Sequence, residues 1–201
     1  MKKIPLCVPY WDEAEALKNG AKYDVNFGFY CLEGDFLDPL WSWLPLRYKQ
    51  SPALLPEMLP QSTWEENLRT ALSEEKWKKL RSHVYKAAGY RCEICGDRGS
   101  PYLEAHEKWS WDDQWCVQKL EGLICLCPVC HKVHHLGLAK RLGLYEDCLK
   151  KMKEVNGWST LTSEREIEKL RKVANERSRY GWIVDLSWLE TGPYYMIYAL
   201  D

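Results

Sequence analysis

Residues 127–135 read Cys-Pro-Val-Cys-His-Lys-Val-His-His, which places two cysteines and three histidines side by side. The same Cys-x-x-Cys spacing occurs upstream at residues 92–95. The turn in each such motif can present two thiolates to one ion, and four thiolates complete a tetrahedral zinc site. We therefore expect a structural Zn²⁺ held by Cys92, Cys95, Cys127 and Cys130.

The histidines form a second candidate metal site. His131 and His135 are four residues apart, so on a helix their side chains share one face and can bind one divalent ion. His106, on a predicted strand, could supply a third imidazole. Three protein ligands leave positions for water and a phosphate oxygen, as in catalytic metal sites. We expect His134 to point away from this pair, as a surface residue or a phosphate contact.

Together these motifs resemble the HNH, or ββα-metal, nuclease superfamily. The marks of that superfamily are a two-knuckle zinc frame, a strand ending in His-His or Asp-His, a middle Asn, and a helix that opens at Cys-His. The corresponding residues are Leu103-Glu104-Ala105-His106-Glu107, then Gln118, then Cys127-Pro128-Val129-Cys130-His131. A subset of bacterial proteins classed as HNH endonucleases is similar over residues 106–109, 117–123, 127–135 and 155–158. The resemblance covers most of the chain, from about residue 64 to about residue 190.

The resemblance implies an endonuclease that hydrolyses phosphodiester bonds of nucleic acid, DNA in particular. Its catalytic divalent ion, Mg²⁺, Mn²⁺, Ni²⁺ or Zn²⁺, would be bound by His106, His131 and His135. Glu107 would stand at the position of the general base, where the superfamily has histidine. A register one residue earlier would make His106 the base instead. The residues that would contact neighbouring phosphates are Lys108, Lys132 and Arg141.

Two departures from the superfamily pattern leave an alternative function open. A glutamate has a reference pKa of about 4.3, so Glu107 would be a weak base near neutral pH unless burial raises its pKa. Gln118 stands where an asparagine usually orients the loop. The alternative is a catalytically inactive zinc module that binds nucleic acid or protein, such as an adaptor or a regulator of a mobile element or phage.

The N-terminal residues 1–47 form a separate unit. The segments Leu6-x-Val8-Pro9-Tyr10, Glu15-Ala16-x-x-x-Gly20-Ala21-x-Tyr23-Asp24 and Gly28-Phe29-Tyr30 resemble a small module (DUF5710-like) found beside DNA-processing domains. The family usually has Trp at the position of Tyr23. We expect a strand, a helix over residues 13–18 capped by Asp12, a hairpin turning around Asn26, and a closing helical turn. The resemblance implies a DNA-associated context and a possible protein partner.

The predicted fold class is α+β: the N-terminal module is followed by a helical domain that carries the zinc-stapled HNH-like core. Residues 48–61, with Pro52, Pro56 and Pro60, read as a linker, and residues 62–201 form the second domain. A capping box at residues 62–66 predicts the start of a helix there. Further expected elements are helices over residues 74–88, 138–156 and 163–178, a strand or turn at 182–189, and a last strand at 194–198.

Composition fits a globular protein. The formal net charge is -1, but basic residues are concentrated in two runs, over residues 76–91 and 140–153. Local basic faces matter more to a polyanion than the net sum. The nine cysteines are an odd number, and we find no signal peptide and no membrane span, so we expect a cytoplasmic protein without disulfides.

Overall fold

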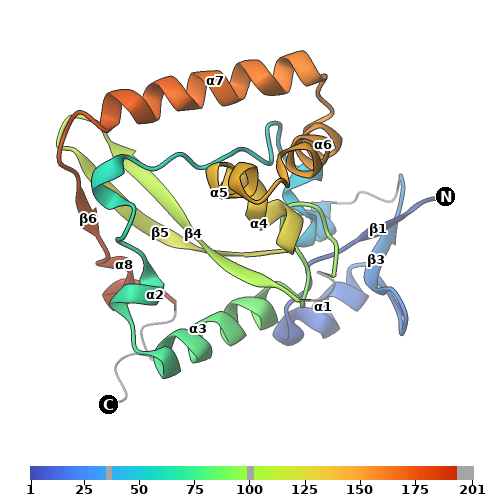
Figure 1. Cartoon of the computed structure of the whole chain (residues 1–201). Helices are drawn as coiled ribbons and strands as arrows, with labels where there is room; N and C mark the ends of the chain where they lie inside the picture. Colours follow the sequence, from blue (N-terminus) through green and yellow to red (C-terminus); the bar gives the residue numbers. More distant parts are fainter. Residues whose placement is uncertain (35–37, 99–101, 194–201) are drawn as a thin grey trace.

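The computed structural model describes residues 1–34, 38–98 and 102–193 of the chain (Figure 1). The described part contains helices and two separate three-stranded sheets. The α+β class expected from the sequence is therefore confirmed. The strand predicted at residues 194–198 lies outside the described residues.

The N-terminal module contains the first sheet, in which two short strands pair antiparallel with a central one in the order β1-β3-β2. Its elements are β1 (Lys3–Pro5), η1 (Tyr10–Asp12), α1 (Glu13–Lys18), β2 (Lys22–Asp24), β3 (Gly28–Leu32) and η2 (Asp38–Trp43). The module has a hydrophobic core of its own, which includes Leu6, Phe29 and Leu40. The helix and the hairpin predicted for this region are confirmed.

The capping role predicted for Asp12 is wrong. No side-chain hydrogen bond caps α1, and Oδ2 of Asp12 accepts a hydrogen bond from Nε1 of Trp43 at 3.0 Å instead. Trp43 is buried, and a buried indole N–H needs an acceptor. The bond therefore ties the start of α1 to the far end of the module.

The second sheet is built on a long hairpin of β4 (Glu104–Asp112) and β5 (Val117–Leu126), which pair antiparallel. Strand β6 (Ile183–Asp185) pairs parallel with β5, so the order is β4-β5-β6 and β4 is an edge strand. Helix α4 (Pro128–His134) follows β5 after a single residue, Cys127. Proline at the first helical position suits this start, because that position needs no backbone N–H.

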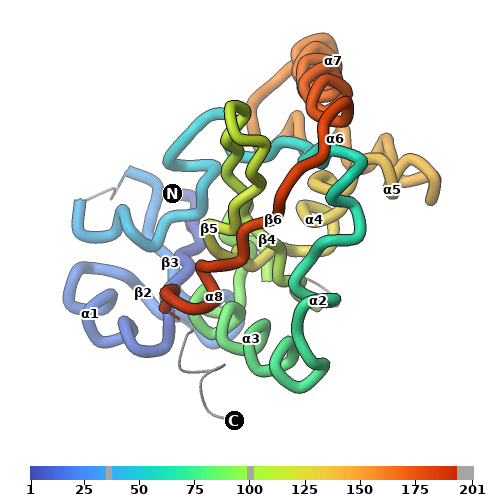
Figure 2. Tube along the Cα trace, turned by 90° about the vertical axis from the view of Figure 1, so that its left-hand side faces the viewer, coloured from blue at the N-terminus to red at the C-terminus, as the bar shows by residue number. Residues whose placement is uncertain are grey.

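The hairpin separates two hydrophobic cores. Side chains of a strand alternate between its faces. On β5, Ile124 and Leu126 join the core that contains the paired cysteines, whereas Leu123 and Cys125 join the core against α3 (Glu74–Ala87). Figures 1 and 2 show α3 and α7 on opposite sides of the hairpin.

The remaining helices depart from the predicted bounds at their ends. They are α2 (Leu68–Ala71), α5 (Leu136–Arg141), α6 (Tyr145–Asn156), α7 (Thr160–Arg177) and α8 (Trp188–Thr191), with short 3-10 turns η3 (Leu46–Tyr48) and η4 (Gln61–Thr63). The single helix predicted over 138–156 is interrupted at Gly143, whose φ of +72° is left-handed. Residues 61–63 form only a 3-10 turn, and the capping box belongs to Asn67 and Thr70 of α2. Helix α7 begins before residue 163 because Ser159 caps it.

The proline-rich segment, residues 48–61, packs against the hydrophobic core that contains the paired cysteines. Leu54 is fully buried among the residues around the paired cysteines. The side chain of Asn156 accepts hydrogen bonds from the backbone N–H groups of Ala53 and Leu54 at 2.9 and 3.0 Å, and donates one to the carbonyl of Leu54 at 2.7 Å. This pinning fixes the course of the residues that follow, including Glu57.

The N-terminal module is docked on the first cysteine motif. Backbone N–H groups of Leu46 and Arg47 donate to the carbonyls of Glu93 and Ile94 at 2.7 and 3.0 Å. No helix among the described residues is long and apolar enough to cross a membrane.

Candidate metal centre and cleft

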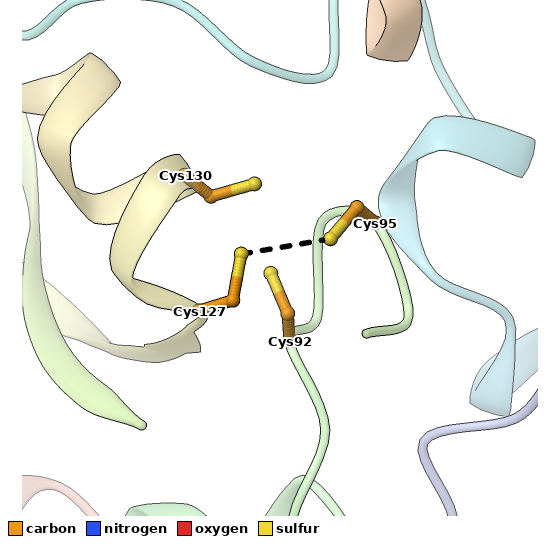
Figure 3. Close-up of side chains that lie close together, drawn as sticks. All are labelled: Cys92, Cys95, Cys127 and Cys130. Atoms are coloured by element: carbon orange, nitrogen blue, oxygen red, sulfur yellow. Dashed lines mark hydrogen bonds between the residues drawn. The ribbon is translucent and has the colours of Figure 1, made fainter. Parts of the chain in front are cut away.

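Four cysteine side chains converge where the second cysteine motif starts α4. Cys92 and Cys95 come from the loop after α3, Cys127 precedes α4 and Cys130 lies within it; their sulfurs point toward one another in Figure 3. All four are buried, and their sulfur atoms lie within 4.8 Å of one another. The Sγ atoms of Cys95 and Cys127 are 3.8 Å apart. Zinc–sulfur bonds of about 2.3 Å in a tetrahedron place the sulfurs about 3.8 Å apart. The cluster could thus bind a structural metal such as zinc.

A lysine lies beside the four thiols. Nζ of Lys151 donates to Oδ2 of Asp97 at 2.9 Å, and the same Asp97 oxygen is 3.1 Å from Sγ of Cys95. The carboxylate and the nearby cysteines raise the pKa of Lys151, which therefore stays charged. A positive charge here offsets part of the negative charge that four thiolates would bring.

Three histidines from β4 and α4 form a second cluster. His106 lies on β4, His131 on α4 and His135 at the end of that helix. One ring nitrogen from each lies within 4.8 Å of the others, which is the convergence that the sequence motifs predicted. Burial lowers the pKa of His106 to about 3 and that of His135 to about 4. Both imidazoles are therefore neutral near pH 7, the form that binds metal ions.

Two of these imidazoles have a carboxylate behind them. Nε2 of His106 is 3.1 Å from Oε2 of Glu57, and Nδ1 of His131 is 2.9 Å from Oε2 of Glu104. The other nitrogen of His106, Nδ1, is buried and has no hydrogen-bond partner among the residues that the structure describes. Carboxylate–histidine pairs of this kind orient the ring and raise its basicity at metal sites. The arrangement fits a metal ion bound at Nδ1 of His106 and Nε2 of His131.

Glu57 was not predicted from the sequence. It lies in the proline-rich segment, outside any periodic pattern, and burial raises its pKa to about 8. Its backbone N–H donates to the carbonyl of His134 at 3.0 Å, so the segment is tied to α4 at this point. The available signal was only a single acidic residue between Pro56 and Pro60.

The prediction that His134 points away from the cluster is wrong. Its ring packs against that of His106, with the centroids 4.5 Å apart, and its buried Nε2 has no hydrogen-bond partner in the described part of the chain. Burial and the neighbouring imidazoles lower its pKa well below the usual value. His134 lies three residues after His131 on α4, and residues three apart are neighbours on a helix surface, so its ring reaches the same cluster.

Glu107 does not join the three imidazoles. It lies on the opposite face of β4 from His106, and its Oε1 accepts a hydrogen bond from the backbone N–H of Leu68, at the start of α2. Burial raises the pKa of Glu107, as a glutamate acting as base near neutral pH would require. Because β4 is an edge strand, side chains from both of its faces border the same cleft.

Gln118 is distant from the histidines. It pairs with Trp111 near the far end of the hairpin, whereas His106 pairs with Ile124. Its side chain is fully buried, and within residues 1–34, 38–98 and 102–193 neither amide atom has a hydrogen-bond partner. The middle position of the motif therefore does not contribute to this site.

A cleft of about 960 Å³ contains the histidine cluster on its wall. The cleft lies along the edge strand β4, between α2 and α3 below and α5 and α7 above in Figure 1. Its basic side chains are Arg69, Arg81, Lys140, Arg141 and Arg171. Arg171 pairs with Glu168. The other four are exposed and form no ion pair with any residue that the structure describes.

Of the three predicted phosphate contacts, only Arg141 borders the cleft. Lys108 extends over Gly122, where an added Cβ would lie 3.2 Å from its Cε, and Lys132 is half-buried on α4. The β-bulge at this point lies in β5, because Lys108 pairs with Gly122 and Trp109 with Leu120, which leaves Glu121 as the extra residue. Arg81 and Lys140, which do border the cleft, belong to the two basic runs of the sequence.

Comparisons with known proteins give no relative from which a role could be transferred. The chain matches no protein-family model, no curated protein and no solved structure. The chemistry of the site therefore rests on its own residues.

Proposed function

We propose that this chain is a metal-dependent HNH-type endonuclease that hydrolyses phosphodiester bonds in nucleic acid, with DNA as the preferred substrate. The observation that carries the proposal is the convergence of His106, His131 and His135 on the wall of a cleft lined by unpaired cations. Imidazole ligands with open coordination positions are typical of hydrolytic metal sites, and unpaired arginines beside them suit a phosphate backbone.

The ligand set favours a bound divalent ion over three packed histidines. Glu57 and Glu104 each engage one ring nitrogen, which leaves the opposite nitrogen of His106 and of His131 available as a ligand. Neutral imidazoles held in place by carboxylates lose little freedom on binding. A divalent ion at these nitrogens would stabilise the extra negative charge that develops on the scissile phosphate.

The remaining roles belong to the walls of the cleft. Glu107, with a pKa raised by burial and Oε1 held by the N–H of Leu68, would take a proton from the attacking water through its other oxygen. Arg69, Arg81 and Arg141 would hold the neighbouring phosphates. Their contacts would carry no sequence information, because phosphates are the same at every step.

The proposal assigns the segment β4-β5-α4 to a ββα-metal core and the four cysteines to a structural zinc frame beside it. The frame would fix the start of α4, and with it His131, relative to the hairpin. Residues 1–47 would be a DUF5710-like module that brings this core to DNA or to a protein partner. Its backbone hydrogen bonds to the first cysteine motif support a fixed position for it.

Nicking of supercoiled plasmid with added Mg²⁺, Mn²⁺ or Ni²⁺ tests the proposal. His131→Ala should abolish nicking while the protein keeps its structural zinc, measured as metal content. Glu107→Gln should reduce the rate by roughly 10²- to 10⁴-fold if this carboxylate is the base. The matched control is His83→Ala, a histidine of α3 that stacks on Trp11 and does not border the cleft.

A second candidate function is binding without cleavage. One observation favours it: Glu107 faces α2, and one of its carboxylate oxygens already accepts a hydrogen bond from the backbone N–H of Leu68. A zinc module of this kind would bind nucleic acid or protein and give no nicking with any of the three metals. Unchanged nicking by His131→Ala would exclude the endonuclease site proposed above.

A further inference from the structure

The cleft carries a large exposed aromatic ring that the proposed hydrolysis does not use. Trp64 borders the cleft, its side chain is 64% exposed, and no ring partner for it occurs among the described residues. Aromatic rings on the wall of a basic groove are the platforms on which single-strand-binding proteins stack nucleobases. Extending the proposed function, we infer that a nucleobase stacks on Trp64, so that the substrate is single-stranded or locally unpaired nucleic acid.

The indole of Trp64 is held in place. Its Nε1 donates a hydrogen bond to the carbonyl of Leu59 at 3.0 Å. The only polar atom of the side chain is thus already satisfied within the protein, and the exposed part is the apolar ring. A fixed ring loses little conformational entropy when a ligand stacks on it, which suits a binding platform.

Trp64 is also close to the histidine cluster. Its hydrogen-bond partner Leu59 is two residues after Glu57, whose carboxylate contacts His106. Two residues of extended chain span roughly 7 Å. A base on Trp64 would therefore belong to a nucleotide next to the scissile phosphate or one step farther. Arg69, from α2, borders the same cleft and would neutralise the phosphate of that nucleotide.

A ring can stack only on the face of a base. In a continuous duplex the faces are covered by the neighbouring base pairs, and the grooves present only base edges. Proteins that bind single strands combine aromatic platforms with a basic groove, and the contacts tolerate any sequence. The cleft has both features. A second exposed ring, Tyr102 at 53% exposure, borders it as well.

Fluorescence anisotropy with a labelled single-stranded oligodeoxynucleotide tests the inference, in buffer without added divalent ions so that no cleavage occurs. The same strand is measured as a perfect duplex, with an abasic position, and as RNA. We expect the single strand to bind more tightly than the duplex. Trp64→Ala should weaken single-strand binding roughly 5- to 150-fold, as for other stacking platforms. Trp64→Phe should keep most of the affinity, because it keeps a ring.

The matched control is Trp115→Ala, an indole 70% exposed at the tip of the β4–β5 hairpin and outside the cleft. Equal affinity for duplex and single strand, or equal loss with Trp64→Ala and Trp115→Ala, would overturn the inference and leave the nuclease proposal intact. If Trp64→Phe is as weak as Trp64→Ala, Trp64 only supports Leu59 and the stacking idea is wrong. Failure of every nucleic acid to bind would overturn the inference together with the proposed function.

Discussion

Replacing Glu57 by glutamine should weaken metal binding at the histidine cluster without disturbing the cysteine cluster. The carboxylate lies 3.1 Å from Nε2 of His106, in a position where His106 is only 2% exposed. Glutamine keeps the shape and can still accept the N–H, but it cannot carry the negative charge that makes the ring a better ligand. Because burial raises the pKa of Glu57 to about 8, the variants are compared above that pH, where the carboxylate is charged. Mutation of such a supporting carboxylate costs 10- to 100-fold in metal affinity, which is about 1.4 to 2.7 kcal/mol.

Two variants of Glu57 should differ in how much metal affinity they lose. We expect Glu57→Gln near 10-fold, because the hydrogen bond survives. Glu57→Ala should approach 100-fold, since it leaves Nε2 of His106 buried without a partner. The assay is a titration with Co²⁺ or Ni²⁺ after the cysteine site has been loaded with zinc, followed by calorimetry. Glu66→Gln is the matched control. Glu66 borders the same cleft, and its side chain forms no hydrogen bond or ion pair with a described residue. Equal affinities for Glu57→Gln and Glu66→Gln would refute the assignment of Glu57 as a supporting carboxylate.

Three other perturbations follow from the packing. Cys127→Ser should remove the structural metal, lower its stoichiometry by one per chain and destabilise the fold strongly, as seen by metal analysis and thermal unfolding. Asn156→Ala breaks three hydrogen bonds to the backbone of residues 53–54 and should cost about 2–4 kcal/mol in denaturant unfolding, whereas the exposed Asn175→Ala should change stability by less than about 0.5 kcal/mol. Gln118→Met removes a buried amide that has no partner and should raise the melting temperature; a lower one would mean that the amide is satisfied in solution.

Local patterns in the sequence predicted the parts of the molecule that depend on short spacings. The two Cys-x-x-Cys motifs come together as expected, and so do His131 and His135 with His106. The helix over residues 74–88 and the N-terminal hairpin also match, because apolar periodicity and turn residues determine them locally.

The missed features depend on contacts between segments far apart in the sequence. Glu57 and Asn156 each act on a partner about fifty or a hundred positions away, and no periodic pattern announces such a pair. The place of Lys108 over Gly122 depends on the pairing of β4 with β5, and the burial of His134 depends on its packing against His106 of β4. A one-residue shift in the pairing of two strands would turn each side chain to the other face.

The course of residues 53–57 has a practical consequence for dividing the protein. A shortened chain starting at residue 62 would keep every cysteine and histidine of both clusters, so it would look complete by sequence. It would nevertheless lose Leu54 from the hydrophobic core and Glu57 from its contact with His106. The side chain of Asn156 would lose its hydrogen bonds to residues 53–54 and become exposed to water. Weak metal binding by such a fragment would result from the loss of residues 53–57 and would not show that the histidines are unable to bind a metal ion.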